Sequence, residues 1–136
     1  MKMKNPLRGF AVATAFALTS PLATAQAIPP SCQQVITVLK VCGADLVHYT
    51  EITRPDQAEA ARKSLDDNVQ NATSNVKELV RKIGEQQAAE RCAAPAFRAP
   101  LVPAMNNLMT ALSFGDAASD KCQDVYGRFV APTLGQ

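Results

Sequence analysis

Apolar residues recur at helical spacing between residues 32 and 49. Intervals of three and four separate Cys32, Val35, Leu39, Cys42, Leu46 and Tyr49, and Ile36, Val38 and Val41 widen this stripe. The pattern is typical of an amphipathic helix. Ser31 and Gln34 have the spacing of a capping box. We therefore expect a helix over about 32–50, with Ser31 as its N-cap, and we expect it to be the most buried helix.

A second helical region is predicted over about 55–92. One register holds Leu65, Val69, Ala72, Val76, Leu79 and Ile83. Thr53 and Asp56 have capping-box spacing at its start, and Pro55 suits a first turn. The segment 66–75 is dense in Asp, Asn, Ser and Thr, which favour caps and turns. The region is therefore either a single helix or two helices broken near 66–75.

Two shorter helices are expected after a connector containing Pro95, Pro100 and Pro103, which we predict to be extended. The first runs over about 104–114 and ends at Gly115. The second runs over about 117–130, with Asp116 as its cap. No alternating strand pattern of useful length is present. The sequence therefore predicts an all-α fold, a small disulfide-stapled bundle of about four helices.

The first 27 residues have the layout of a secretory signal peptide. Lys2, Lys4 and Arg8 precede a short apolar stretch, and small residues lead to Ala27. We expect cleavage near Ala27, with cleavage after Ala25 as the alternative. The apolar stretch is shorter than the roughly 20 residues that span a bilayer. Residues 28–136 then form a single helical domain, periplasmic or secreted, with no stable membrane anchor.

Removal of this leader changes the charge of the protein. The whole chain has 14 basic and 12 acidic side chains, and three of the basic ones lie in the leader. The remainder carries 11 basic and 12 acidic side chains, a net charge of −1. Without a basic excess, nucleic acid is not an expected partner.

All four cysteines lie in the predicted mature domain, and an even number in an oxidising compartment predicts two disulfides. Cys32 and Cys42 lie about 15 Å apart on one helix, at a rise of about 1.5 Å per residue. They cannot pair with each other, because a disulfide needs Cα atoms within roughly 7 Å. In a bundle with a break near residue 70, we predict the pairs Cys32–Cys122 and Cys42–Cys92. The alternative is the swapped pairing, Cys32–Cys92 and Cys42–Cys122.

Residues that could carry catalysis or bind a cofactor are sparse. The predicted mature chain has one histidine, His48, and no G-x-S-x-G motif, and its acids resemble solvated helix charges. The Asp66-x-Asn68 start of a calcium loop lacks the glycine and glutamate that such a loop needs. Gly43, Gly84 and Gly127 are isolated helix glycines rather than a phosphate loop. We predict no catalytic residue, no metal site and no cofactor.

One apolar group stands out as a candidate surface for a partner or ligand. It consists of Leu101, Val102, Met105, Leu108 and Met109. Methionine-rich surfaces adapt to varied partners. An ordinary core role is the competing interpretation, and the sequence favours it.

Three function classes follow from these observations. The favoured one is an exported, non-catalytic interaction protein (an inhibitor, an immunity-type protein or an envelope chaperone) whose partner is another protein. The second is a carrier of an apolar small ligand in the bundle interior. The third is an enzyme without a recognisable motif.

Overall fold

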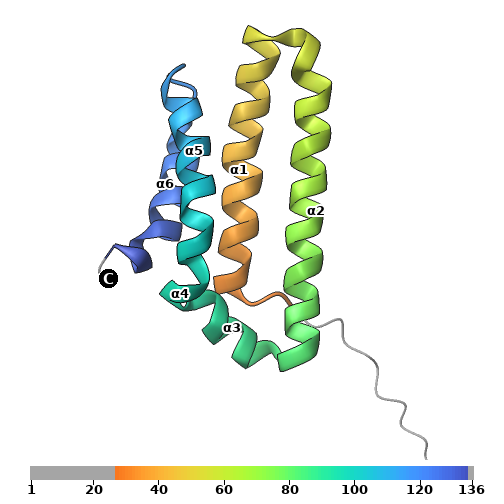
Figure 1. Cartoon of the computed structure of the whole chain (residues 1–136), viewed down its shortest axis with the longest axis vertical. Coiled ribbons are helices and arrows are strands. Elements are labelled where there is room, and N and C mark those ends of the chain that lie inside the picture. The colour runs from red at the N-terminus through yellow and green to blue at the C-terminus, as the bar shows by residue number, and fades with distance from the viewer. Residues whose placement is uncertain (1–26, 135–136) are drawn as a thin grey trace, which may run out of the picture.

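The first predicted helix is the central element of the fold. The computed structural model describes residues 27–134, so residues 1–26 of the predicted leader lie outside it. Figure 1 shows α1 (Pro30–Thr53) with α2 on one side and α5 and α6 on the other. Apolar side chains around most of its circumference explain this position, because a helix that is apolar on several faces must be covered on several faces. The other elements are η1 (Pro55–Gln57), α2 (Ala58–Ile83), α3 (Glu85–Ala93), α4 (Pro95–Arg98), η2 (Ala99–Leu101), α5 (Val102–Ser113), α6 (Asp120–Val130) and η3 (Ala131–Thr133).

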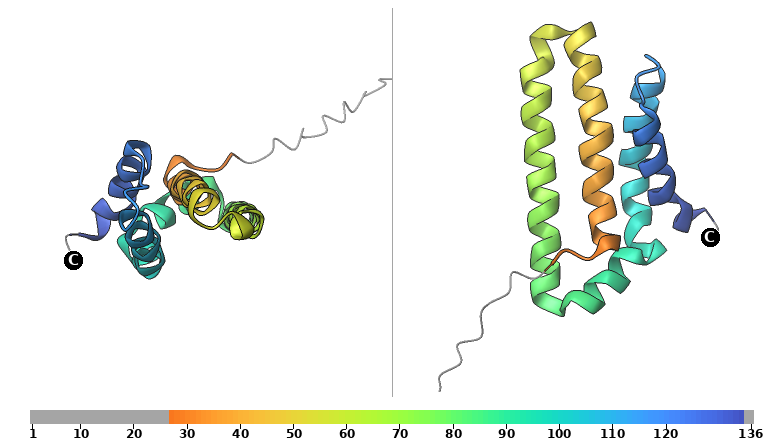
Figure 2. Two further views of the ribbon diagram at one scale, coloured as in Figure 1. Left: turned by 90° about the horizontal axis from the view of Figure 1, so that it is seen from above. Right: turned by 180° about the vertical axis from the view of Figure 1, so that it is seen from behind.

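The all-α prediction is confirmed for residues 27–134, which contain no strand. Figure 2 shows α1 and α2 as an antiparallel pair, with α5 and α6 forming a second pair beside α1. The short helices α3 and α4 cross below α1 and carry the chain from one pair to the other. Short connections join α1 to α2 and α5 to α6, so the helices of each pair run in opposite directions.

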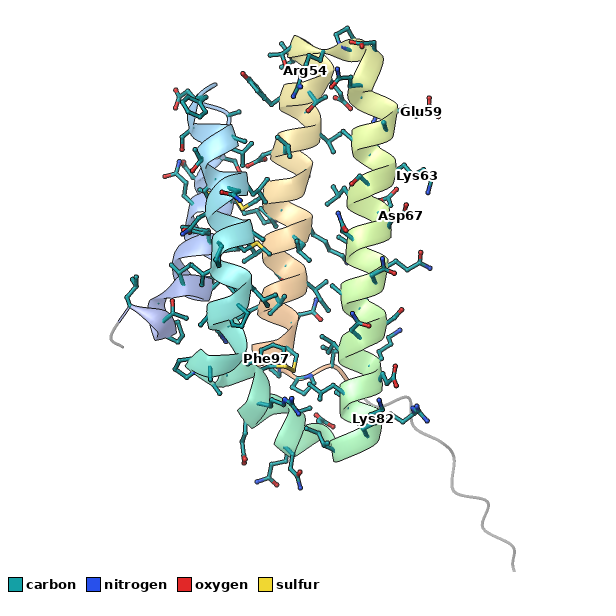
Figure 3. All side chains as sticks on the ribbon, in the orientation of Figure 1. Arg54, Glu59, Lys63, Asp67, Lys82 and Phe97 are labelled. Carbon is teal, nitrogen blue, oxygen red and sulfur yellow. A yellow bond between two sulfur atoms is a disulfide. The ribbon has the colours of Figure 1, made fainter. Side chains whose placement is uncertain are left out.

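The core divides into two clusters that share α1. One lies against α5 and α6, with Val35, Val38, Cys42, Met105, Leu112, Cys122, Val125, Phe129 and Val130 buried. The other lies against α2 and α3, with Cys32, Ile36, Val76, Val80, Ala88 and Cys92 buried. Phe97 of α4 packs against both clusters, and Figure 3 shows it beside the start of α1.

The predicted disulfide pairing is wrong, although its premise holds. Cys32 and Cys42 lie on one helix and do not pair with each other. Cys32 pairs with Cys92, with Cα atoms 5.0 Å apart, and Cys42 pairs with Cys122, at 4.9 Å. The reason is the path of α2. Because α2 is not broken near residue 70, it returns the chain to the N-terminal end of α1 and brings Cys92 beside Cys32.

The break in the 55–92 region lies at Gly84, not at 66–75. Gly84 has a φ of 84°, a left-handed conformation that glycine adopts without steric cost. The turn-forming residues of 66–75 remain helical, because Val69 and Ala72 pack in register against the cluster that α1 forms with α2 and α3. Packing of the apolar face outweighs their weak local preference for a turn.

The predicted helix caps are also corrected. α1 begins at Pro30, and the Ser31 hydroxyl donates to the Ala89 carbonyl of α3 at 2.7 Å rather than capping α1. Thr53 likewise gives no cap to the next helix, because its hydroxyl donates to the Tyr49 carbonyl. At α6, the Ser119 hydroxyl accepts from the Cys122 amide at 3.1 Å, so Ser119 is the N-cap in place of Asp116.

The proline connector is helical rather than extended. Pro95, Pro100 and Pro103 each lie in the first turn of a short helical segment, in α4, η2 and α5 respectively. A first-turn position suits proline, because the amide that proline lacks would have no helical partner there. The chain therefore reaches α5 through consecutive short turns, and α5 starts at Val102 rather than at residue 104.

Candidate functional site

The side chain of Arg98 is a buried hydrogen-bonding centre at the end of α4. It is 3% exposed and has three acceptors. Nε donates to the Cys92 carbonyl at 2.9 Å, and Nη1 donates to the Phe129 carbonyl at 3.2 Å. Nη2 donates to Oε1 of Gln34 at 2.7 Å. One guanidinium thus ties the ends of α3 and α6 to the first turns of α1.

The two carbonyls explain how a buried cation is tolerated at this position. Cys92 lies in the last turn of α3 and Phe129 in the last turn of α6, where helix dipoles place partial negative charge. The guanidinium carbon also lies 5.8 Å from the centre of the Phe129 ring, within cation–π range. Burial lowers the pKa of Arg98. Among residues 27–134, no carboxylate forms an ion pair with it.

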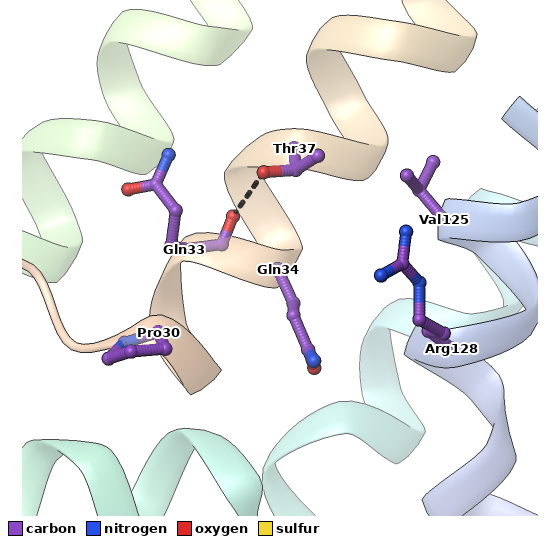
Figure 4. A pocket seen from close by; sticks show the side chains of 6 residues that line it. All are labelled: Pro30, Gln33, Gln34, Thr37, Val125 and Arg128. Atoms are coloured by element: carbon purple, nitrogen blue, oxygen red, sulfur yellow. Dashed lines mark hydrogen bonds between the residues drawn. The ribbon is translucent and has the colours of Figure 1, made fainter. Parts of the chain in front are cut away.

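A groove of about 210 Å³ lies next to Arg98, between α1 and α6. Its lining consists of Pro30, Gln33, Gln34, Thr37, Val125 and Arg128. Figure 4 shows Gln34 of α1 and Arg128 of α6 beside the same gap. The Thr37 hydroxyl donates to the Gln33 carbonyl at 2.9 Å, and Arg128 forms an ion pair with Asp124 one turn earlier on α6. The groove therefore combines amide and guanidinium groups with a small apolar wall.

A wider groove of about 660 Å³ lies between α5 and α6. It is lined by Asn106, Met109, Thr110, Ser113, Phe114 and Tyr126. Phe114 is 86% exposed, and the Tyr126 hydroxyl donates to Oδ1 of Asn106. Sδ of Met109 lies 3.4 Å from Sγ of Cys122, so Met109 lies between this groove and a disulfide. This groove brings two aromatic rings and a methionine to the surface.

A third, more apolar groove crosses α1 between α2 and α5, with a volume of about 180 Å³. The residues that line it include Gly43 of α1, Leu65 of α2 and Leu108 of α5. It opens at the surface and is smaller than the roughly 300–1,000 Å³ typical of small-molecule sites. This groove gives little support to a carrier of a larger apolar ligand.

The five residues predicted as a candidate surface lie mostly in the core. Met105 is buried in the cluster that α1 forms with α5 and α6. The other four are half-buried and pack against that same cluster: Leu101, Val102, Leu108 and Met109. Of these, Leu108 and Met109 line grooves. Sequence reasoning missed Phe114, although a signal was present. Phe114 falls outside the register of Leu101, Met105, Leu108 and Leu112, so helical geometry places its ring away from their buried face.

Titratable side chains elsewhere form surface ion pairs. His48 has a side chain 74% exposed, and Nδ1 lies 3.6 Å from Glu51. Glu51 also accepts hydrogen bonds from Arg62 of α2 at 2.9 and 2.6 Å, and these bonds are the main cause of its lowered pKa. Among residues 27–134, all four cysteines are in disulfides and no cluster of three metal-binding side chains is found.

Comparisons with known proteins found no match to this chain among family descriptions, curated proteins or solved structures. Within the part of the chain that the structure describes, no helix is both long and apolar enough to span a bilayer. The disulfides are consistent with an oxidising, extracytoplasmic compartment.

Proposed function

We propose that this chain is an exported, non-catalytic protein-binding module whose partner docks in the groove between α5 and α6. The predicted leader and the two disulfides support export. Inhibitors, immunity-type proteins and envelope chaperones are the functional classes that such a module would serve. The partner is another protein rather than a nucleic acid or a membrane.

The observation that carries this proposal is the position of Phe114. A single exposed apolar residue is common on protein surfaces and needs no explanation. Phe114 differs because it lies at a groove that also contains Tyr126 and Met109. Aromatic residues and methionine are enriched in protein interfaces, where a few such anchors supply most of the binding energy.

The lining of the groove indicates the chemistry of the partner. None of its lining residues is charged, and Asn106, Thr110 and Ser113 supply amide and hydroxyl groups along α5. A neutral apolar side chain would contact Phe114 and Met109, while backbone groups beside it would bond to the polar row. The best fit is therefore an uncharged segment of a protein.

The scaffold is suited to this role because the groove is held in place before binding. Cys122 fixes α6 to α1 through Cys42, and Leu112 of α5 is fully buried against the same cluster. A preorganised surface loses little conformational entropy when a partner binds.

Affinity capture from the envelope fraction of the producing cells tests the proposal. The bait is the disulfide-bonded protein, compared with Phe114→Ser and with Ile52→Ser as a matched control. Ile52 is 69% exposed but lies at the end of α1, outside the groove. We expect a defined protein that binds the wild type and Ile52→Ser, and that binds Phe114→Ser at least tenfold more weakly.

Two results would overturn the proposal. One is capture of the same proteins, in the same amounts, by Phe114→Ser and the wild type. The other is self-association: if sedimentation shows a dimer that Phe114→Ser dissolves, the groove joins two copies of this chain instead. Thermal unfolding of each variant checks that the fold is kept, which we expect because both side chains are exposed.

A further inference from the structure

The amide of Gln34 has a fixed orientation in the groove between α1 and α6. A guanidinium donates hydrogen bonds and accepts none, so Oε1 of Gln34 must face Arg98. The NH₂ group is therefore directed elsewhere, and no acceptor for it is found among residues 27–134. Because no buried side-chain nitrogen or oxygen lacks a partner in that range, this NH₂ group is open to solvent. Gln34 lines the groove, and its NH₂ group is the part of the amide that Arg98 leaves free.

Positive charge reinforces this donor from two directions. Arg98 lies directly behind Gln34, and its three acceptors are all uncharged. The two helix ends offset only part of a full charge, and buried charges are poorly screened, so part of the field of Arg98 acts on the bound Gln34 amide. Arg128 adds a second guanidinium at the groove wall, although Asp124 neutralises part of its charge. An acceptor that carries negative charge fits this environment better than a neutral one.

We propose that the groove between α1 and α6 binds a carboxylate of about amino-acid size. One carboxylate oxygen accepts from the Gln34 NH₂ group and the other from Arg128, while Val125 and Pro30 contact the adjoining apolar part of the ligand. The volume of about 210 Å³ equals the share of about seven water molecules, which suits a small acid or one chain-terminal residue. This site is separate from the groove of Phe114 and does not depend on the proposed function.

An NMR titration of the disulfide-bonded protein tests the proposal, because side-chain NH₂ groups of glutamine give their own signals. Three probes separate the sources of the carboxylate: acetate for a small acid, N-acetylalanine for the end of a peptide, and N-acetylalaninamide as the neutral control. We expect N-acetylalanine to shift the Gln34 NH₂ signals to saturation at millimolar concentrations, and the neutral amide to leave them unchanged.

Gln34→Glu is the most informative variant. Its carboxylate can accept from Arg98, so the buried guanidinium gains a charged partner and the melting temperature should not fall. The same change replaces the donor in the groove with a negative charge, so N-acetylalanine should bind at least tenfold more weakly. Arg128→Gln should weaken binding by a similar factor. Lys121→Gln makes the same change in net charge on α6, outside the groove, and should bind as the wild type does.

Each outcome has a defined meaning. Binding of acetate as tight as that of N-acetylalanine identifies a site for small acids, and tighter binding of N-acetylalanine identifies a site for peptide ends. Equal binding of N-acetylalaninamide would overturn the proposal, as would Gln34→Glu with unchanged affinity. If no probe shifts the Gln34 signals, the three uncharged acceptors of Arg98 satisfy its charge and the groove is not a carboxylate site.

Discussion

The two sides of α1 are built differently, although each contains one disulfide. On the side of α2, here called the α2 half, the buried cluster is formed by small or aliphatic side chains of α1, α2 and α3. On the other side, the α6 half, the cluster of α1, α5 and α6 includes Phe129, Leu112 and Met105. The cluster of the α6 half therefore contains larger side chains, and they come from α5 and α6, which are shorter than α2.

The surfaces of the two halves also differ, in their charged side chains and in their grooves. Figure 3 shows Glu59, Lys63 and Asp67 along the outer side of α2. Lys63 pairs with Asp67 one turn away, and Lys82 pairs with Glu78. In the α6 half, α6 contributes to the groove of Phe114 and to the groove of Gln34. Both proposed binding surfaces therefore lie in the α6 half, whereas the outer side of α2 has charged side chains in ion pairs.

Removing one disulfide at a time is the strongest test of this division. Replacing either pair by alanine should lower the free energy of unfolding by about 2–5 kcal/mol. The pairs span 60 and 80 residues, so loop closure alone makes their effects differ by only about 0.3 kcal/mol. A larger difference in denaturant unfolding would show that one half depends more on its crosslink.

Hydrogen exchange on the same two variants locates the damage. Without Cys42–Cys122 we expect faster exchange in α5 and α6, and without Cys32–Cys92 in α3 and the end of α2. Uniformly faster exchange along the whole chain in both variants would contradict the division into halves and indicate one cooperative unit.

Arg98→Ala should have the next largest effect, because Arg98 joins the two halves. Its loss leaves the carbonyls of Cys92, in the α2 half, and Phe129, in the α6 half, without their donor. We expect the free energy of unfolding to fall by about 2–4 kcal/mol, since each buried unpaired group costs about 1–3 kcal/mol. Arg91→Ala, an exposed change on α3, serves as the control and should stay within about 0.5 kcal/mol. A loss below 1 kcal/mol in Arg98→Ala would mean that water replaces the guanidinium.

Glycine substitutions give a smaller test of packing in the two halves. No atom lies within 4 Å of a Cβ added at Gly127 of α6, so Gly127→Ala should stabilise the protein by about 0.5–1 kcal/mol. A Cβ added at Gly43 would lie 2.3 Å from Cδ1 of Leu65, which would have to move. Gly43→Ala should therefore destabilise by about 1 kcal/mol. In a Leu65→Ala background, Gly43→Ala should be neutral or stabilising. Thermal unfolding of the wild type, the two single variants and the double variant measures this coupling.

The smallest expected effect is an acid dependence at the ion pair between α1 and α2. The pKa of Glu51 lies below its ordinary value of 4.5 because Arg62 bonds to the carboxylate. A carboxyl group with a lowered pKa stabilises the fold fully above its unfolded pKa. That stabilisation is lost as the pH falls below 4.5 and through the lowered folded pKa. Urea unfolding between pH 6 and pH 3 should therefore show a smaller loss of stability in Arg62→Gln than in the wild type.

Lys82→Gln is the matched control for this pair. The pKa of Glu78 is also lowered, mainly by its bond from Lys82, but both residues lie on α2. Since that pair links no helices, its removal should change the acid dependence less than Arg62→Gln does. An equal effect of the two substitutions would show that the bridge between α1 and α2 adds nothing beyond a local ion pair.

Local patterns in the sequence predicted some elements well and others poorly. The stripe from Cys32 to Tyr49 identified the central helix and its burial, because apolar periodicity reports directly on the buried face. The turn-forming residues near 70 were misleading, since their preferences are weak against the packing of Val69 and Ala72. The grooves escaped prediction because their residues meet only in the folded chain: Gln34 lies in α1, Phe114 follows α5, and Tyr126 and Arg128 lie in α6.

The sequence by itself determined that this chain is helical and that Cys32 and Cys42 must bond elsewhere, because both conclusions rest on the short-range geometry of one helix. Only the tertiary structure decided which cysteines meet, that Gly84 ends α2, and that Arg98 is buried against two helix ends. These features depend on the length and direction of α2 and on contacts between residues far apart in the chain, which no local pattern encodes.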